Sequence, residues 1–251
     1  MIKIILSGVN GRMGKAVEEL CASDESVQIV GGIDINLGVP HKFPTVSDPF
    51  SLETKADAII DFSHHSCAAM LCDYAVKTGT PVVFATTGYT EEESALIKKT
   101  SESIALFTSA NMSLGVNLII ELSKLAAKVL SNFDIEIIEK HHNQKLDAPS
   151  GTALMLADGI RSVRSDSEYI YDRTGVSRKR QSNELGIHSV RGGTIVGEHE
   201  VLFAGPNECV TISHSAASRE VFASGALCAA KFIAAKAPGL YHMADMIAAQ
   251  P

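Results

Sequence analysis

The chain has 251 residues, enough for one large domain or two ordinary ones, and 45% of them are hydrophobic, so a sizeable core is available. Lysine and arginine number 22 against 29 acidic residues, and the net charge of −7 argues against nucleic acid or an anionic membrane as the main partner. Five cysteines without a CxxC pair, no signal-peptide pattern and no apolar run of membrane-spanning length predict free thiols in a cytoplasmic protein.

The N-terminal residues predict a strand, a glycine-rich turn and a helix in that order. Residues 2–6 form an apolar run typical of a strand buried on both faces. The turn consists of Gly8, Val9, Asn10, Gly11, Arg12, Met13 and Gly14. Glycines at this spacing permit the tight turn, the approach of a pyrophosphate and close packing of the helix. The context is that of a dinucleotide-binding site.

A second strand pattern over residues 27–34 ends in Asp34, 20 residues after Gly14. An acid that binds the adenosine ribose is expected at this position, and the alternative is an ordinary aspartate in a turn. Ile35 follows, where an enzyme that binds a 2′-phosphate often has an arginine. The pair favours NADH over NADPH, although Arg12 or Lys15 could also reach a 2′-phosphate.

Strand and helix patterns continue to alternate up to residue 112. Strands are predicted over 56–62, 80–85 and 104–107, helices over 66–77 (with Ser63 a possible cap) and 91–101, and a loop over 36–54. This order predicts a parallel, doubly wound sheet, in which ligands bind beyond the carboxyl ends of the strands. Besides the glycine turn and Asp34, such ends carry Ala85, Thr86, Thr87, Ser109, Ala110, Asn111 and Met112.

The second half of the chain contains a dense polar motif. Residues 114–130 predict an amphipathic helix, and 133–139 alternate apolar and acidic residues as in a half-exposed strand. His141, His142 and Lys145 then fall within five residues. Histidine titrates nearest to neutral pH and is the usual proton donor, and lysine supplies positive charge for an anionic substrate.

A capped helix follows this motif. Ser150 is the expected N-cap of a helix that runs from Gly151 to about residue 163. The backbone N–H groups of Gly151 and Thr152 would then form an anion site at the helix N-terminus. A proton donor, a cation and an anion site so close together predict catalysis on a small carboxylate. The alternative interpretation is a polar loop before a capped helix.

The remaining residues predict a sheet and a returning helix. Residues 164–185 are expected to form a solvated loop, and strand patterns over 187–190, 195–203 and 210–215 predict an open mixed sheet. Self-association would cover such a sheet. His188, His199 and His214 lack metal-site spacing, so they are interpreted as surface or core residues and no metal is expected. The pair His64 and His65 is interpreted as a loop at a strand end.

A long helix over residues 219–237 and a last segment near 239–247 close the chain. We expect them to return to the first domain, which is then discontinuous. The expected domains are a dinucleotide-binding domain of residues 1–112 and 220–251, and a substrate-binding and oligomerisation domain of residues 113–219.

These motifs resemble those of the 4-hydroxy-tetrahydrodipicolinate reductases, formerly called dihydrodipicolinate reductases, of the lysine and diaminopimelate pathway. Matching stretches run nearly end to end, at residues 8–14, 85–88, 109–116, 139–153, 197–199, at Arg219 with Phe222 and residues 225–226, and at 239–241. Residues 139–153 are the most specific of them. Two positions depart from the family pattern: Ala85 replaces the usual glycine, and Asp34 with Ile35 replaces a frequent Glu-Arg pair.

The resemblance implies an N-terminal Rossmann-type domain with a parallel sheet, and an α+β domain with an open mixed sheet. It implies reduction of a cyclic, unsaturated imine dicarboxylate to tetrahydrodipicolinate with NADH, NADPH or both, and a homotetramer built through the second-domain sheets. Nucleic acid and membrane are not expected as partners.

The resemblance also assigns roles to individual residues. His141 corresponds to the proton donor and acceptor, Lys145 to a proton donor, and His142 to a contact of a substrate carboxylate. Gly151 and Thr152 correspond to the backbone site for a carboxylate. The cofactor contacts correspond to Gly8, Val9, Asn10, Gly11, Arg12, Met13, Asp34, Ala85, Thr86, Thr87, Ser109, Ala110, Asn111 and Met112.

Two other functions share part of this pattern. Another two-domain imine or amino-acid dehydrogenase, such as an aspartate dehydrogenase-like protein, would share the glycine turn without needing the His-His-x-x-Lys motif. A cofactor-sensing regulator would bind NAD(H) and dispense with catalytic acids. The intact stretch 139–152 argues against both.

Overall fold

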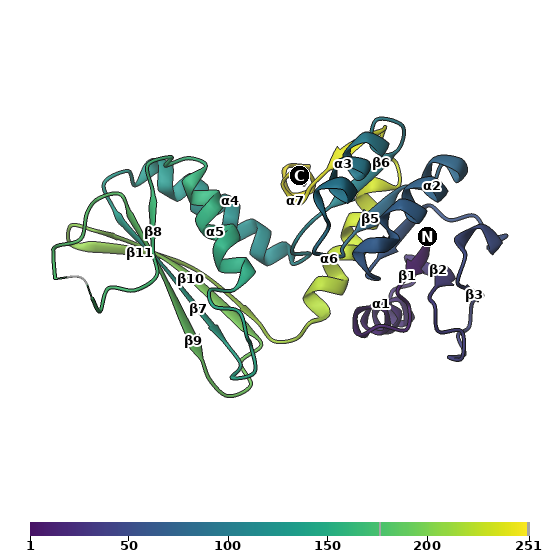
Figure 1. Ribbon diagram of the computed structural model, residues 1–251, viewed down its shortest axis with the longest axis horizontal. Coiled ribbons are helices and arrows are strands. Elements are labelled where there is room, and N and C mark those ends of the chain that lie inside the picture. Colours follow the sequence, from purple (N-terminus) through teal and green to yellow (C-terminus); the bar gives the residue numbers. More distant parts are fainter. Residues whose placement is uncertain (176, 250–251) are drawn as a thin grey trace. The chain divides into compact units, whose positions relative to one another are not determined.

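The computed structural model describes residues 1–175 and 177–249, which belong to two compact units (Figure 1). Unit 1 comprises Met1–Leu114 and the C-terminal part of the chain from Arg219, and unit 2 comprises Gly115–Ser218. Within the described part of the chain, no helix is long and apolar enough to cross a membrane.

Unit 1 is built on a sheet of seven parallel strands. Their order across the sheet is β12 (Gly239–Tyr241), β6 (Ala105–Thr108), β5 (Val82–Phe84), β4 (Ala58–Asp61), β1 (Ile2–Ser7), β2 (Val27–Ile33) and β3 (Thr45–Val46). The central strands are almost continuously apolar because both faces of the sheet are covered. The predicted parallel, doubly wound sheet is confirmed.

Two layers of helices cover this sheet. Unit 1 contains α1 (Arg12–Ser23), α2 (Ala68–Thr78), α3 (Glu91–Thr100), α6 (Glu220–Ile233), α7 (Met243–Ala248) and the short 3₁₀ helices η1 (Pro49–Ser51) and η2 (His65–Cys67). Successive residues of β1 pack against opposite layers of helices. Ile4 belongs to a core cluster with α1, α6 and α7, and Ile5 belongs to a cluster with α2 and α3. This division follows from the two-residue period of a strand.

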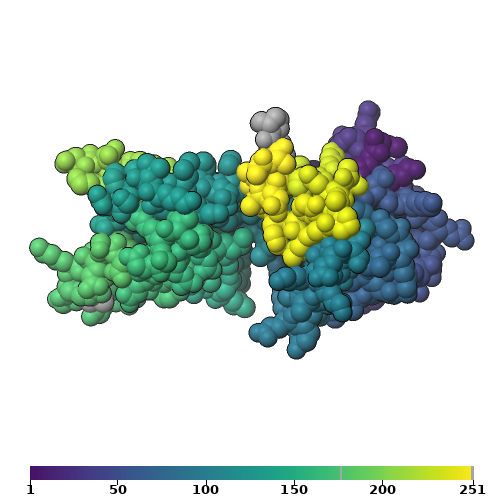
Figure 2. All heavy atoms as spheres, turned by 90° about the horizontal axis from the view of Figure 1, so that it is seen from above, coloured from purple at the N-terminus to yellow at the C-terminus, as the bar shows by residue number. Residues whose placement is uncertain are grey.

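Three details of unit 1 differ from the sequence prediction. Residues 36–54 are not all loop, because β3 pairs with β2 and η1 follows it. The chain end adds a seventh strand, β12, beside β6, and in Figure 2 the C-terminal residues, in yellow, lie against blue residues of the same unit. Ser63 does not cap a helix: His64 caps η2, and Ser63 binds the carboxylate of Asp61, which is buried and needs hydrogen-bond donors.

Unit 2 is built on a mixed sheet of five strands, as predicted. Their order is β11 (Glu208–Ala216), β10 (Gly197–Gly205), β7 (Asp134–His141), β9 (Glu184–Arg191) and β8 (Glu168–Ile170). β10 is antiparallel to β7 and β11, whereas β7, β9 and β8 run parallel. The helices α4 (Leu114–Val129) and α5 (Gly151–Arg161) lie on one face of the sheet (Figure 1).

The core of unit 2 lies between this face and the two helices. β7 alternates strictly, so that Ile135 and Ile137 pack with Leu156 of α5 and Ile119 of α4. The intervening side chains, such as Ile138, point to the face that no helix covers. Alternation in the sequence therefore sets which residues of β7 are buried.

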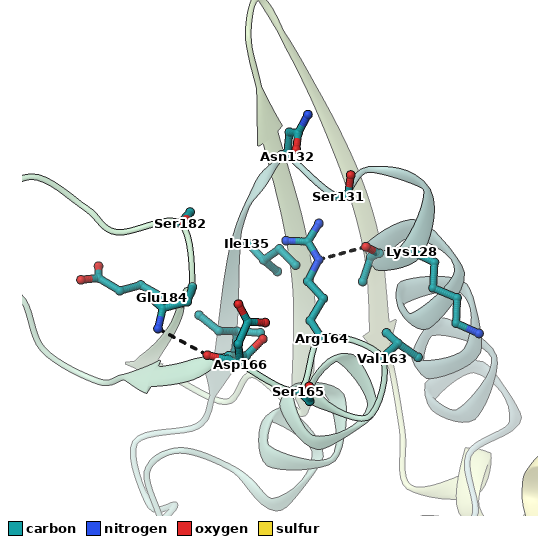
Figure 3. A pocket seen from close by; sticks show the side chains of 14 residues that line it. Lys128, Ser131, Asn132, Ile135, Val163, Arg164, Ser165, Asp166, Ser182 and Glu184 are labelled. Atoms are coloured by element: carbon teal, nitrogen blue, oxygen red, sulfur yellow. Dashed lines mark hydrogen bonds between the residues drawn. The ribbon is translucent and has the colours of Figure 1, made fainter.

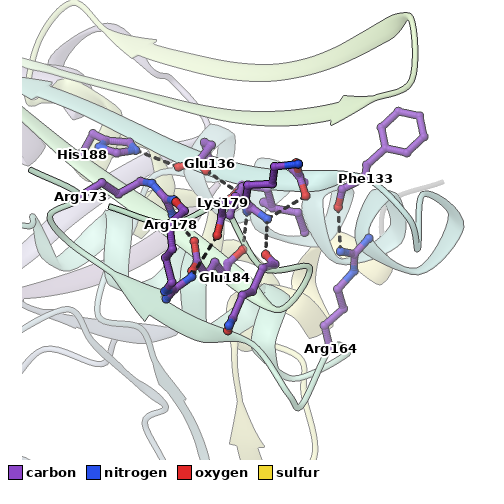
Figure 4. A network of polar contacts seen from close by, with 12 residues as sticks. Phe133, Glu136, Arg164, Arg173, Arg178, Lys179, Glu184 and His188 are labelled. Carbon is purple, nitrogen blue, oxygen red and sulfur yellow. Dashed lines mark hydrogen bonds and ion pairs between the residues drawn. The ribbon is translucent and has the colours of Figure 1, made fainter. Parts of the chain in front are cut away.

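The prediction of a solvated loop over residues 164–185 was wrong in two respects: residues 168–170 form strand β8, and the arginines are paired with carboxylates. Arg173 and Arg178 both form ion pairs with Glu184, and Arg180 binds Asp134 and Glu136 (Figure 4). Glu184 is buried at the start of β9, and a buried carboxylate requires opposite charges. A sequence pattern does not reveal that requirement, because a run of charges in a loop usually remains in water.

Candidate active site

The polar motif of unit 2 is organised around the carboxylate of Glu139, which has no exposed surface. It accepts a hydrogen bond from His141 Nδ1 at 2.6 Å. Arg191 donates to both of its oxygens, at 2.6 and 2.7 Å, and the backbone N–H of Ser150 donates at 3.1 Å. This bidentate arginine and the two further donors compensate the burial of the charge.

Glu139 is ionised at neutral pH and orients His141. Burial by itself raises the pKa of Glu139, but hydrogen bonds from Arg191 and His141 outweigh it and lower the pKa to about 2. Because Nδ1 of His141 faces this carboxylate, the imidazole carries its other reactive atom, Nε2, on the opposite side of the ring. A side chain at Gly197 would lie 3.1 Å from that nitrogen, so the glycine leaves space beside it.

Ser150 joins the start of α5 to the sheet. Its hydroxyl oxygen accepts a hydrogen bond from the backbone N–H of Ala153, which confirms the predicted N-cap. The same hydroxyl lies 3.0 Å from Nε2 of His199, within hydrogen-bond distance. Burial, as the main cause, and the nearby His141, as the second, lower the pKa of His199 to about 4, so its ring is neutral at neutral pH. The rings of His199 and His141 meet edge to face at 5.2 Å.

The loop between β7 and α5 carries the remaining predicted residues of unit 2. Lys145 forms an ion pair with Asp147 at 2.9 Å, and this contact holds the pKa of Asp147 below its usual range. The charge of Lys145 also contributes, as a minor cause, to the low pKa of His199. His142 is half-buried, and its carbonyl accepts a hydrogen bond from the backbone N–H of Lys145.

The first turn of α5 is open to a ligand at Gly151. This residue is exposed, and no atom lies within 4 Å of the position that a side chain would take. Thr152 follows in the same turn, half-buried. The predicted residues His141, His142, Lys145, Gly151 and Thr152 thus lie on one continuous segment around the Glu139 carboxylate.

Sequence reasoning missed three residues of this cluster: Glu139, Arg191 and His199. Strand register brings them together, because Arg191 of β9 pairs with His141, and His199 of β10 pairs with Glu139. One signal was available in the sequence. Glu139 occupies the same phase of β7 as the buried residues Ile135 and Ile137, and an acid in an apolar phase points to a buried functional carboxylate.

The glycine turn of unit 1 has the geometry that a dinucleotide requires. Gly8 has a φ of +76°, and a side chain there would lie 2.7 Å from the carbonyl oxygen of Phe62. A side chain at Gly14 would lie 2.4 Å from the carbonyl oxygens of Gly8 and Val9. Helix α1 begins at Arg12 without a side-chain cap, so its first turn is left for an anion. Arg12 is exposed and Met13 half-buried beside this turn.

Asp34 lies against the glycine turn, as its position in the sequence predicts. Its carboxylate accepts hydrogen bonds from the backbone N–H groups of Asn10 and Asn36, each at 2.9 Å. The carboxylate is half-exposed and keeps acceptor capacity for a ribose hydroxyl.

The other predicted cofactor residues lie at the carboxyl ends of β5 and β6. Ala85 has a negative φ, because Asn207 is the one non-glycine residue with positive φ in the described ranges, so the backbone there does not need glycine. Thr86 donates to the buried Asp61, and Thr87 is exposed. Ser109 donates to the carbonyl of Asn111 at 2.6 Å in a tight turn, Ala110 is exposed, and Met112 is buried in the core.

A cavity of about 710 Å³ lies elsewhere in unit 2 and contains none of the predicted residues (Figure 3). Arg164 extends along it and donates to the carbonyls of Ala127 in the last turn of α4, of Leu130 just after the helix, and of Phe133 before β7. The first two bonds satisfy carbonyls at the end of the helix, which identifies Arg164 as a C-terminal cap. Among the described residues, no group of three or more His, Cys, Asp or Glu side chains is placed to hold a metal ion.

Comparison with known proteins agrees with this geometry over the whole chain. The family model for the N-terminus of dihydrodipicolinate reductase matches residues 2–112, and the model for its C-terminus matches residues 115–247. A 4-hydroxy-tetrahydrodipicolinate reductase of Caldanaerobacter subterraneus subsp. tengcongensis is 54% identical over 98% of both chains. One of Clostridium tetani is 47% identical over 98% of this chain and 97% of its own.

Solved structures give the same result. The dihydrodipicolinate reductase of Paenisporosarcina sp. TG-14, with dipicolinate bound, superimposes with a TM-score of 0.83 at 25% identity and covers 96% of this chain and 97% of its own. A diaminopimelate dehydrogenase of C. glutamicum, at 12% identity and a TM-score of 0.59, shares the fold. By its two family matches and its 54% identical relative, the chain belongs to the dihydrodipicolinate reductases, the NAD(P)H-dependent 4-hydroxy-tetrahydrodipicolinate reductases of lysine and diaminopimelate biosynthesis.

Proposed function

We propose that unit 2 of this chain binds 4-hydroxy-tetrahydrodipicolinate and that His141 supplies the proton for its reduction to tetrahydrodipicolinate. The reaction takes up one hydride and one proton and releases one water. The observation that carries the proposal is the pairing of His141 with the buried carboxylate of Glu139, next to an open helix N-terminus. A positioned acid and an anion site are what proton delivery to a carboxylate substrate requires.

The remaining side chains of unit 2 have complementary roles in this proposal. Gly151 and Thr152 bind one substrate carboxylate through the first turn of α5, and His142 contacts a carboxylate as well. Lys145 exchanges its ion pair with the half-exposed Asp147 for the substrate and serves as a further proton donor. Glu139 keeps His141 in one orientation, so that Nε2 is the atom that donates.

Unit 1 holds the cofactor in this proposal, and the reduced nicotinamide supplies the hydride when it is bound. The residues that would hold it are Gly8, Val9, Asn10, Gly11, Arg12, Met13, Asp34, Ala85, Thr86, Thr87, Ser109, Ala110, Asn111 and Met112. The Asp34 carboxylate favours a free 2′-hydroxyl, and the neighbouring Ile35, which is 95% exposed, brings no positive charge for a 2′-phosphate. Use of NADH, or of both cofactors, follows from this pair.

A homotetramer formed through the sheets of unit 2 completes the proposal. The helices α4 and α5 cover one face of this sheet, and the other face presents side chains such as Ile138 and Leu202. Such a face is a ready site for a second copy of the sheet.

The experiment is oxidation of NADH and of NADPH by the purified protein, with substrate generated in situ from pyruvate and aspartate semialdehyde. We expect turnover with NADH at least as fast as with NADPH. In His141→Gln, kcat should fall by a factor of about 10² to 10⁴, the usual contribution of a general acid. His188→Gln, on the opposite face of the sheet, should leave kcat unchanged. Cofactor binding without turnover of properly formed substrate would contradict the proposal and favour a sensor.

A further inference from the structure

The segment between β2 and β3 folds back over the glycine turn. Two of its side chains are responsible, His41 and Phe43, whose rings stack at 5.0 Å with an angle of 20°. Phe43 packs against Gly32 of β2, where a side chain would lie 3.1 Å from the Phe43 ring. The side chain of His41 is only 4% exposed. A histidine so deeply buried in a surface segment requires partners for both ring nitrogens.

Both partners of His41 are hydrogen-bond acceptors. Nδ1 lies 3.1 Å from a carboxylate oxygen of Glu18 on α1, and Nε2 lies 3.0 Å from Oδ1 of Asn10. The orientation of the Asn10 amide is set by its NH₂ group, which donates to the carbonyl of Asn36 at 2.6 Å. The amide oxygen of Asn10 can only accept, so Nε2 of His41 is the donor in that contact.

Asn10 connects this contact to the acid at the end of β2. Its backbone N–H donates to the carboxylate of Asp34 at 2.9 Å. A continuous chain of hydrogen bonds therefore runs from Glu18 through His41 and Asn10 to Asp34. Gly8 and Gly11 on either side of Asn10 give the turn many accessible conformations. The hydrogen bond from His41 to the Asn10 side chain restricts them and orders the turn before a ligand binds.

We propose that His41 is a positioning residue for the adenosine end of the cofactor. By donating from Nε2 to Asn10, it holds the glycine turn and the Asp34 carboxylate in the arrangement that binds the adenosine ribose, without itself contacting the cofactor. The inference rests on the proposed cofactor role of unit 1 and extends it to a segment that the sequence motifs leave unassigned.

Two substitutions separate positioning from mere packing. The amide nitrogen of glutamine reaches the position of Nε2, whereas that of asparagine reaches the position of Nδ1. His41→Gln therefore keeps the donor to Asn10 and loses the one to Glu18, and His41→Asn does the reverse. Both remove the aromatic ring that stacks on Phe43, so both lose that stacking contact.

Three quantities are measured: the Kd of ADP-ribose, the Kd of NADH, and the dicarboxylate KM at saturating NADH. ADP-ribose is used because it carries the adenosine end of the cofactor without the nicotinamide. In His41→Asn both Kd values should rise about tenfold, the usual effect of losing one hydrogen bond in a charged network. In His41→Gln they should stay within about twofold of the wild type. The dicarboxylate KM and kcat at saturating NADH should not change in either variant.

Equal losses in the two variants would reduce His41 to a packing residue and overturn the inference. If His41→Asn fails to fold, Asn10→Ala replaces it, since it removes the acceptor and leaves the stacked rings intact; an affinity for ADP-ribose equal to the wild type would then overturn the inference. If the wild type binds NADH and ADP-ribose and the variants bind them equally well, the proposed role of His41 is contradicted and the cofactor role of unit 1 is not. Failure of the wild type to bind NADH and ADP-ribose would overturn the cofactor role and this inference together.

Discussion

Glu139 places a carboxylate charge in the interior of unit 2, where the charge needs hydrogen-bond donors on every side. Arg191, His141 and the backbone of Ser150 supply them. Such an ion pair adds little net stability, but removal of one partner leaves the other charge buried and unpaired. The arrangement therefore fixes the geometry of His141 more than it stabilises the fold.

If Glu139 fixes the geometry of His141, the substitution Glu139→Gln should impair catalysis, because it preserves the shape of the side chain and removes its charge. The amide can no longer serve both Arg191 and His141 as a bidentate acceptor, so the imidazole loses its fixed orientation. We expect kcat to fall at least tenfold, as for other orienting carboxylates, with a smaller change in the dicarboxylate KM. Steady-state kinetics measure both values, and Glu198→Gln, on the opposite face of the sheet, is the control. An unchanged kcat would contradict the orienting role.

Lys145 offers a second test at the scale of single residues. Lys145→Ala removes the cation proposed to bind the substrate, so the dicarboxylate KM should rise about tenfold and kcat should fall as well. Lys140→Ala is the matched control, because Lys140 lies near the end of β7, before the loop that carries Lys145, and pairs with Glu198 on the opposite face of the sheet. The idea fails if the two variants have the same kinetics.

Helix α5 shows how an element positions part of the site. Its N-cap, Ser150, is tied to β7 through its backbone N–H and to β10 through its hydroxyl. The first turn of the helix is therefore fixed relative to two strands. A helix start anchored in this way presents its backbone N–H groups in a constant place.

Ser150→Ala should loosen that anchor. The variant loses the cap of α5 and leaves His199 without its partner, so the free energy of unfolding should fall by about 1–2 kcal/mol. The dicarboxylate KM should rise, because Gly151 and Thr152 are no longer held in place. Denaturant titration and steady-state kinetics give the two values. Ser162→Ala, at the exposed other end of the same helix, should change the free energy of unfolding by less than about 0.5 kcal/mol; equal effects at the two ends would refute the anchor.

Stability of the whole molecule should fall toward acid pH because of two groups in this cluster. Burial lowers the folded-state pKa of His199 from 6.5 to about 4, so between these values the unfolded chain binds a proton that the folded chain does not. The contribution of His199 to the free energy of unfolding is fully present above pH 6.5 and is lost as the pH drops toward 4. Glu139 extends the loss from pH 4.5 down to about 2, because its folded-state pKa is also depressed.

Between pH 7 and 4, the histidine contributes a change on the order of 3 kcal/mol to the free energy of unfolding. His199→Gln should therefore show a flatter dependence of this free energy on pH over that range, whatever its stability at pH 7. Denaturant titrations at several pH values compare the slopes. Parallel slopes for the wild type and the variant would contradict the prediction.

The uncovered face of the five-stranded sheet determines a further property of the whole molecule. If the tetramer forms through this face, a charge at its centre must disrupt it, since burying an unpaired lysine is costly. Leu202→Lys should shift the mass in solution, measured by light scattering after size-exclusion chromatography, toward that of smaller species. Leu125→Lys, on the exposed side of α4, should leave the mass unchanged. A tetramer in both variants would place the interface elsewhere.

Much of the fold and part of the candidate site follow from short stretches of sequence. The glycine turn before α1, the two-residue period of β7 and the Ser150 cap are local patterns, and local sterics and hydrogen bonding decide them. Short elements escaped prediction: β3 has two residues, and β8 and β12 have three each, too few to show a period. Those strands exist because neighbouring strands offer them backbone partners.

The sequence by itself determined the two kinds of sheet, the positions of His141 and Lys145, and the place of Asp34 at the end of the second strand, because each follows from a pattern within a short stretch of the chain. Only the tertiary structure decided the partners: Arg191 for Glu139, His199 for Ser150, the two arginines for Glu184, and His41 for Asn10. The physical reason is that strand register and burial select these contacts. A buried charge or ring nitrogen must find a partner wherever the fold brings one, at a distance along the chain that no local period encodes.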